Sequence, residues 1–124
     1  LEWCEEVCEL PLHHRTEIPG VLEAVLQAHE GGSRIQLAQH LDNDEPIDMG
    51  TAMWKLYVNT SDCQRLYDRA IEAGCESVME PENLDRWPVT VAFVKDFDGY
   101  LIEFVEHHEG TRSGVPDPKK PQKD

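Results

Sequence analysis

The sequence predicts an α+β fold built from two βαβββ modules, the first of which lacks its opening strand. From residue 53 onward the expected elements follow the order strand, helix, strand, strand, strand. From residue 1 they follow the order helix, strand, strand, strand. The second half is therefore a complete unit and the first half is the same unit without its first strand, which indicates a twofold internal repeat of about fifty residues.

This repeat sets the expected domain organisation. We expect one domain over 1–109, divided into module one (1–49) and module two (50–109). From residue 110 to 124 the chain is polar, with prolines and lysines clustered together, and we expect a tail there. The chain begins at Leu1 without a methionine, so we expect the missing strand to lie upstream.

In module one, a short helix over 1–9 is predicted because Trp3, Val7 and Leu10 are spaced by three or four residues. Pro11 ends it. Three strands are predicted next, at 10–18, 21–28 and 33–41, separated by Pro-Gly and Gly-Gly pairs. The third strand alternates, with Ile35, Leu37 and Gln39 on one side and Arg34, Gln36, Ala38 and His40 on the other.

In module two, the strand 53–59 is followed by a helix that we expect Ser61 to cap and Gly74 to end. A short strand at 76–80 and a loop at 81–88 come next. The strands 89–95 and 100–106 are joined by Asp-Phe-Asp-Gly at 96–99, a tight turn with glycine where a positive φ is needed.

The composition limits the partners of this protein. The formal net charge is −14, from 25 acidic and 11 basic side chains among 124 residues. Such a surface repels nucleic-acid phosphates and anionic lipids and attracts a cationic ligand, so we expect neither nucleic acid nor membrane as a partner. No apolar run approaches the roughly 20 residues of a membrane span. The four cysteines form no CxxC pair, so we expect reduced thiols and a cytoplasmic location.

Glu103 is the first candidate functional residue. In the last strand, Leu101, Glu103 and Val105 share one face, and the opposite face is also apolar. A carboxylate buried between such faces needs a partner, because burying it alone costs several kcal/mol. The pattern leaves open whether that partner is a metal, a basic side chain or a ligand, or whether Glu103 only makes a structural salt bridge.

The segment 92–104, AFVKDFDGYLIEF, resembles the C-terminal signature of the vicinal oxygen chelate superfamily, which includes glyoxalase I, the bleomycin-resistance proteins and extradiol dioxygenases. The usual form is Asp-Pro-Asp-Gly-aromatic-x-Ile-Glu, and here Phe97 replaces the proline. The helix end Ala-Ile-Glu-Ala-Gly at 70–74 is also typical. The resemblance implies two modules whose curved mixed sheets form a cleft, and it implies a homodimer.

The resemblance also implies metal-ligand positions, of which this chain retains few. Glu103 falls on the last ligand position, as ligand and as catalytic residue, and Gln36 falls on another as a weak oxygen ligand. The position usually held by histidine falls on Lys55, or on Met53. Divalent metals in proteins are coordinated by three or four strong ligands. We therefore expect no cofactor, although a divalent metal stays open, and we hypothesise that Lys55 pairs with Glu103 in place of the metal.

Other side chains complete the expected site. Tyr57 shares the side of Lys55, His40 shares the face of Gln36, and Trp87 is an aromatic on a loop. These residues are expected to contact a ligand. His13 and His14 should point oppositely on a strand, and His107 and His108 are expected to be solvated. Two functions remain: a protein that binds a small, cationic molecule without a full metal site, or a metal-dependent lyase, isomerase or dioxygenase of the glyoxalase I type.

Overall fold

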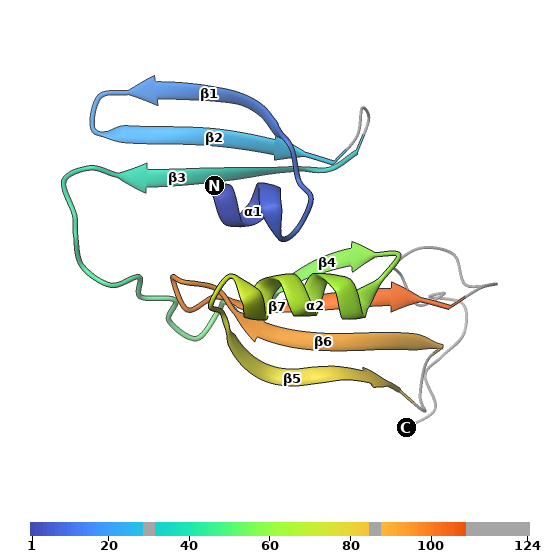
Figure 1. Ribbon diagram of the computed structural model, residues 1–124. Helices are drawn as coiled ribbons and strands as arrows, with labels where there is room; N and C mark the ends of the chain where they lie inside the picture. Colours follow the sequence, from blue (N-terminus) through green and yellow to red (C-terminus); the bar gives the residue numbers. More distant parts are fainter. Residues whose placement is uncertain (29–31, 85–87, 109–124) are drawn as a thin grey trace. The chain divides into compact units, whose positions relative to one another are not determined.

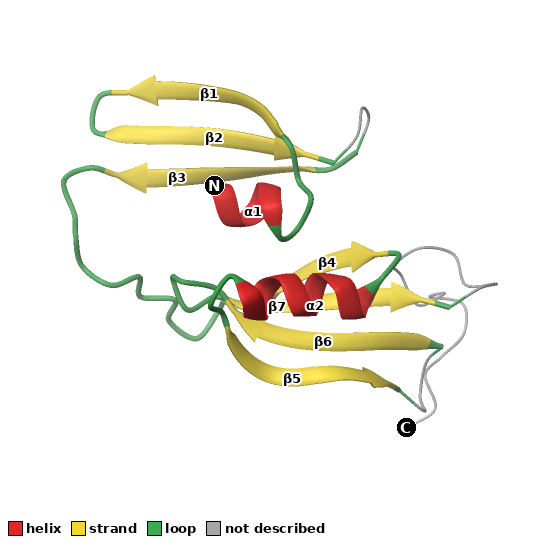
Figure 2. Ribbon diagram, viewed as in Figure 1, coloured by secondary structure: helices red, strands yellow, loops and turns green. Residues whose placement is uncertain are grey.

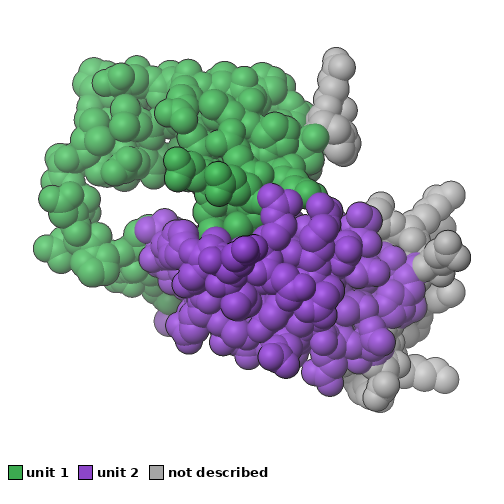
Figure 3. All heavy atoms as spheres, in the orientation of Figure 1, with its two compact units in different colours: residues 1–50 green, residues 51–124 purple. Residues whose placement is uncertain are grey.

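The computed structural model describes residues 1–28, 32–84 and 88–108, and it contains two compact units (Figure 1). Unit 1 is Leu1–Gly50 and unit 2 is Thr51–Asp124 (Figure 3). In the described ranges each unit contains one helix and one sheet, so the predicted α+β class is confirmed. None of the helices in the described ranges is long and apolar enough to cross a membrane.

Unit 1 is a short helix followed by a three-stranded antiparallel sheet. The elements are α1 (Glu2–Glu6), β1 (Leu12–Ile18), β2 (Val21–Gln27) and β3 (Arg34–His40), and the strands lie in the order β1-β2-β3. The helix ends earlier than predicted because Glu9 takes a positive φ of 56° and the Leu10 amide turns back to the Cys4 carbonyl. Leu26 is the most deeply buried residue of this sheet.

One prediction for unit 1 is wrong. The two adjacent histidines of β1 were expected to point oppositely, but the strand pairing slips between Leu12 and His14. A bulge adds a residue to one strand and disturbs the alternation of side chains. As a result, the Nδ1 atoms of His13 and His14 lie 2.6 Å apart, and Arg34 lies 3.3 Å from the Nε2 of His13.

Unit 2 has the predicted order strand, helix, strand, strand, strand. Its elements are β4 (Leu56–Thr60), α2 (Cys63–Glu72), β5 (Glu76–Asn83), β6 (Val89–Lys95) and β7 (Leu101–His107). The strands lie in the order β4-β7-β6-β5, with β4 parallel to β7 and the other pairs antiparallel. Helix α2 covers one face of this sheet (Figure 2).

The core of unit 2 lies between α2 and the sheet. The helix contributes fully buried Cys63, Leu66 and Ala70. The alternating residues of the two central strands face them, and all are within 1% of complete burial: Ala92, Val94, Ile102 and Phe104. Burying a large apolar side chain stabilises a fold by roughly 1.5–3 kcal/mol, so this layer fixes β6 and β7 and thereby the side chains on their opposite face.

Several predicted boundaries of unit 2 need correction. Helix α2 is capped by Asp62 and not by Ser61, because the Asp62 carboxylate accepts a hydrogen bond of 3.0 Å from the Arg65 amide. Strand β4 begins at Leu56 instead of Met53. Strand β5 continues through Pro81, where a loop was expected. β5 lies at the edge of the sheet and its pairing is irregular there, which is where a strand tolerates proline.

Candidate functional site around Glu103

The candidate site lies on the sheet face of unit 2 opposite α2. Strand pairing places Tyr57 and Phe93 directly beside Glu103, and Met79 beside Phe93. Directly paired residues point to the same side of a sheet. We call this side the Glu103 face; its members are Tyr57, Asn59, Met79, Val89, Val91, Phe93, Glu103, Val105 and His107.

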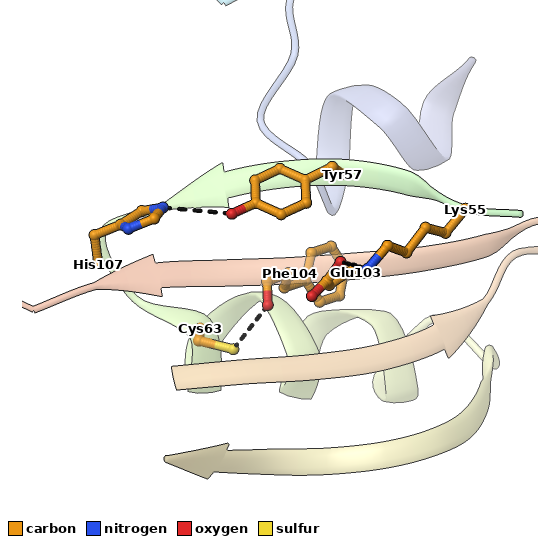
Figure 4. Close-up of polar contacts among 6 residues, drawn as sticks. All are labelled: Lys55, Tyr57, Cys63, Glu103, Phe104 and His107. Atoms are coloured by element: carbon orange, nitrogen blue, oxygen red, sulfur yellow. Dashed lines mark hydrogen bonds and ion pairs between the residues drawn. The ribbon is translucent and has the colours of Figure 1, made fainter. Parts of the chain in front are cut away.

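Glu103 is the buried carboxylate that the sequence pattern predicted. It is 7% exposed and is the one charged or polar residue among the buried residues of the described ranges. Its Oε2 atom forms an ion pair with the Lys55 ammonium (Figure 4). That oxygen accepts no hydrogen bond from any residue in 1–28, 32–84 or 88–108, so the Lys55 charge is its main compensation. The hypothesised pairing of Lys55 with Glu103 is therefore confirmed.

Lys55 is held by aromatic rings as well as by the carboxylate. It lies just before β4, and its Nζ is 4.1 Å from the centre of the Trp54 ring and 5.4 Å from the centre of the Phe93 ring. Both distances fall within the roughly 6 Å range of cation–π attraction. Trp54 is 73% exposed, so this wall of the site faces solvent. The carboxylate and the two rings therefore surround the Lys55 ammonium.

The rest of the Glu103 face divides into a covered part and an open part. Val89, Val91 and Val105 are buried, with Met79, Leu84 and Phe93 packed against them. Along β4 the face is open, since Tyr57 is 45% exposed and Asn59 is also exposed. A ligand that reached Glu103 would therefore arrive along β4.

The open part contains polar groups that the sequence only partly indicated. The Nε2 of His107 lies 3.2 Å from the Asn59 side-chain oxygen. The same atom lies 3.5 Å from the Tyr57 hydroxyl, and Figure 4 shows this second contact. Burial, and to a lesser extent the Glu103 carboxylate, raise the pKa of Tyr57 above its ordinary value of 10.0. His107 was expected to be solvated. The sequence could have indicated its place in the site, because His107 lies an even number of residues after Glu103 in the last strand and therefore points to the same side of the sheet.

The Asp-Phe-Asp-Gly turn at 96–99, directly before β7, positions Glu103. The Asp96 carboxylate accepts hydrogen bonds from the amides of Asp98 (3.0 Å) and Tyr100 (2.8 Å), and Gly99 takes a φ of 84°. Burial of Asp96 raises its pKa. Phe97, which stands where the family signature has proline, is 68% exposed. The motif therefore fixes the start of β7, two residues before the strand buries its carboxylate.

The other predicted ligand residues lie outside this arrangement. Gln36 and His40 are both in β3 of unit 1, where they share a face and are exposed. Their participation in a site with Glu103 stays a prediction. Trp87 lies outside the described residues. Met53, the alternative to Lys55, is 36% exposed, and the side chain that pairs with Glu103 is that of Lys55.

The described residues of the Glu103 face do not fit a divalent metal. Glu103 is already neutralised by an ammonium, and a protonated lysine repels a cation. Within the ranges that the structure describes, no group of three or more histidine, cysteine, aspartate or glutamate side chains could hold a metal. Metals with catalytic roles are held by about three protein ligands, and among its described residues the Glu103 face offers only Glu103 and His107.

The sequence model of the Glyoxalase/Bleomycin resistance protein/Dioxygenase superfamily matches residues 2–104. The chain belongs to this superfamily. The match covers both units up to the middle of β7, so the resemblance seen in the terminal motif extends over the whole fold.

Individual proteins resemble this chain to a modest degree. A protein named lactoylglutathione lyase, from Neisseria meningitidis serogroup A, is 28% identical over 116 residues, which cover 91% of this chain and 84% of the relative. Glyoxalase I from Zea mays has a TM-score of 0.77 at 20% identity, covering 87% of this chain and 40% of the maize chain. TioX from Micromonospora has a TM-score of 0.64 at 23% identity, covering 86% of both chains. These structural likenesses establish the fold alone.

Proposed function

We propose that this superfamily member binds a small organic molecule on the Glu103 face of unit 2, without a complete metal site. The observation that carries the proposal is the Lys55–Glu103 ion pair, which fills the position where the family resemblance implies a metal ligand. With a lysine at that position the Glu103 carboxylate has a positive partner without a metal, and the buried ion pair can still recognise a ligand.

The surroundings of the ion pair suit such binding. Trp54 and Phe93 offer aromatic surface, and Tyr57 and His107 offer hydrogen-bonding groups on the same side. Ligand sites commonly combine aromatic walls with a few convergent polar groups. The net charge of −14 favours a cationic ligand over an anionic one.

A mapped fragment screen tests this proposal. The wild-type protein, labelled with ¹⁵N, is mixed with a library of small anionic, neutral and cationic fragments, and amide shifts are recorded by NMR. We expect hits whose shifts concentrate in β4, β6 and β7 around Tyr57, Phe93 and Glu103. Hits that cluster only elsewhere, or a library without hits, would reject the proposal.

A metal-dependent lyase remains the second candidate. It is favoured by the 28% identity to the protein named lactoylglutathione lyase, and Glu103 would then be its metal ligand and catalytic residue. An assay of the lyase reaction in both directions, from lactoylglutathione and from its cleavage products glutathione and methylglyoxal, with nickel or zinc added, separates the candidates. The binding proposal predicts no turnover above that of a Glu103→Gln variant, whereas turnover lost in that variant would establish the lyase.

A further inference from the structure

The surroundings of the Lys55 ammonium form a cation site in their own right. The Glu103 carboxylate provides the negative charge, and Trp54 and Phe93 provide two ring faces. We call these three residues the ammonium cage. A carboxylate combined with aromatic faces is the chemistry that recognises alkylammonium and quaternary ammonium groups.

We propose that the ammonium cage binds the ammonium group of an external organic ligand, and that Lys55 is a built-in occupant which this ligand displaces. The inference rests on the proposed function, and it specifies the ligand class as an organic molecule with a primary or quaternary alkylammonium group. The net charge of −14 attracts such a molecule to the surface.

The exposure of the cage residues makes displacement feasible. The Glu103 side chain is only 9% exposed, whereas that of Lys55 is 21% exposed and Trp54 is 73% exposed. The deep end of the cage is thus fixed in the sheet, and the outer wall is open to solvent. Lysine has a flexible four-carbon stem, so its ammonium can leave through the open side without movement of β7.

The same tether sets the expected affinity. A group held on a short flexible linker competes at an effective concentration in the millimolar range or above. An external ammonium must therefore outcompete Lys55, and removal of the Lys55 ammonium should strengthen its binding. We expect the dissociation constant for n-butylammonium to fall at least about tenfold in a Lys55→Ala variant.

Chemical rescue provides the first test. Lys55→Ala is titrated with n-butylammonium chloride against sodium chloride of equal ionic strength, and binding is followed by NMR and by thermal unfolding. Saturable binding and a raised melting temperature, both lost in Lys55→Ala/Glu103→Gln, are expected. The matched control is Lys95→Ala, because Lys95 makes an exposed 3.9 Å pair with Glu76 on the same sheet; it should gain nothing.

A second measurement avoids dependence on the folding of Lys55→Ala. In the wild type, the ¹³C-labelled ε-methylene of Lys55 should resonate upfield of that of Lys95, because it lies near two rings, and should move downfield when saturating tetramethylammonium displaces it. A Lys55 signal equal to that of Lys95, or rescue of Lys95→Ala as large as that of Lys55→Ala, would overturn the ammonium cage. Neutral fragments that still bound the Glu103 face in the screen would then leave the proposed function standing.

Discussion

Replacing Lys55 by methionine should destabilise the protein far more than replacing other lysines does. Methionine keeps an unbranched apolar stem close to that of lysine but leaves the Glu103 carboxylate buried without a cation. Removal of one partner from a buried pair costs about 3–5 kcal/mol, whereas exposed pairs are worth under about 1 kcal/mol. With side-chain exposures of 21% for Lys55 and 9% for Glu103, the pair lies nearer the buried limit, and we expect a loss of about 2–4 kcal/mol.

The double variant Lys55→Met/Glu103→Met completes a thermodynamic cycle. Replacing both members of a buried pair by apolar side chains is often neutral or stabilising, so the double variant should lie within about 1 kcal/mol of the wild type. The free energy of unfolding is measured by urea denaturation followed by circular dichroism. Lys95→Met, which breaks the exposed pair with Glu76, is the control and should cost less than about 0.5 kcal/mol.

Two results would refute this reasoning. One is a Lys55→Met variant no less stable than Lys95→Met, which would show that Glu103 finds compensation elsewhere. The other is a double variant whose loss equals the sum of the single losses, which would show that the two side chains are not coupled.

Three further predictions concern unit 2. The pKa of Tyr57 should lie above 10.0 in the wild type and should fall in Glu103→Gln. It is obtained by subtracting the ultraviolet titration of Tyr57→Phe from that of the wild type. Because the pKa is raised in the folded state, the stability that this group contributes is lost only as the pH rises through that pKa. Burial, and next the nearby carboxylates, raise the pKa of Cys63 to about 12. Its alkylation by iodoacetamide in the folded protein, measured by mass spectrometry, should therefore be negligible near about pH 8. Rapid labelling of Cys63 would contradict its burial. Asp62→Ala should lower the free energy of unfolding by about 1 kcal/mol and Ser61→Ala by much less; equal effects would restore Ser61 as the cap.

The fold could be predicted from the sequence because the spacing of apolar residues in unit 2 reflects which side chains are buried on each face of its sheet. The order of elements and the parity of Glu103 depend on local patterns of apolar residues, and the turn at 96–99 depends on a glycine that can take a positive φ; the structure confirms all three. The pairing of Lys55 with Glu103 was predictable because parity and the family resemblance placed both on one side.

Features that depend on partners distant in sequence escaped prediction. The bulge that brings His13 and His14 together arises from pairing with β2, and Pro81 is tolerated because β5 is an edge strand. Aspartate and serine are both good helix caps, so the sequence alone does not distinguish Asp62 from Ser61. The cap is the residue directly before the first helical turn, and in the structure that residue is Asp62. His107 joined the site because β7 extends one residue further than its apolar pattern indicates.

The most direct test of the central claim is the metal content of the purified protein. We propose that Lys55 holds the Glu103 carboxylate in place of a metal, so wild type and Glu103→Gln, purified without chelator and exposed to nickel or zinc, should carry equal, substoichiometric metal by elemental analysis. One tightly bound metal per chain in the wild type, lost in Glu103→Gln, would contradict the account.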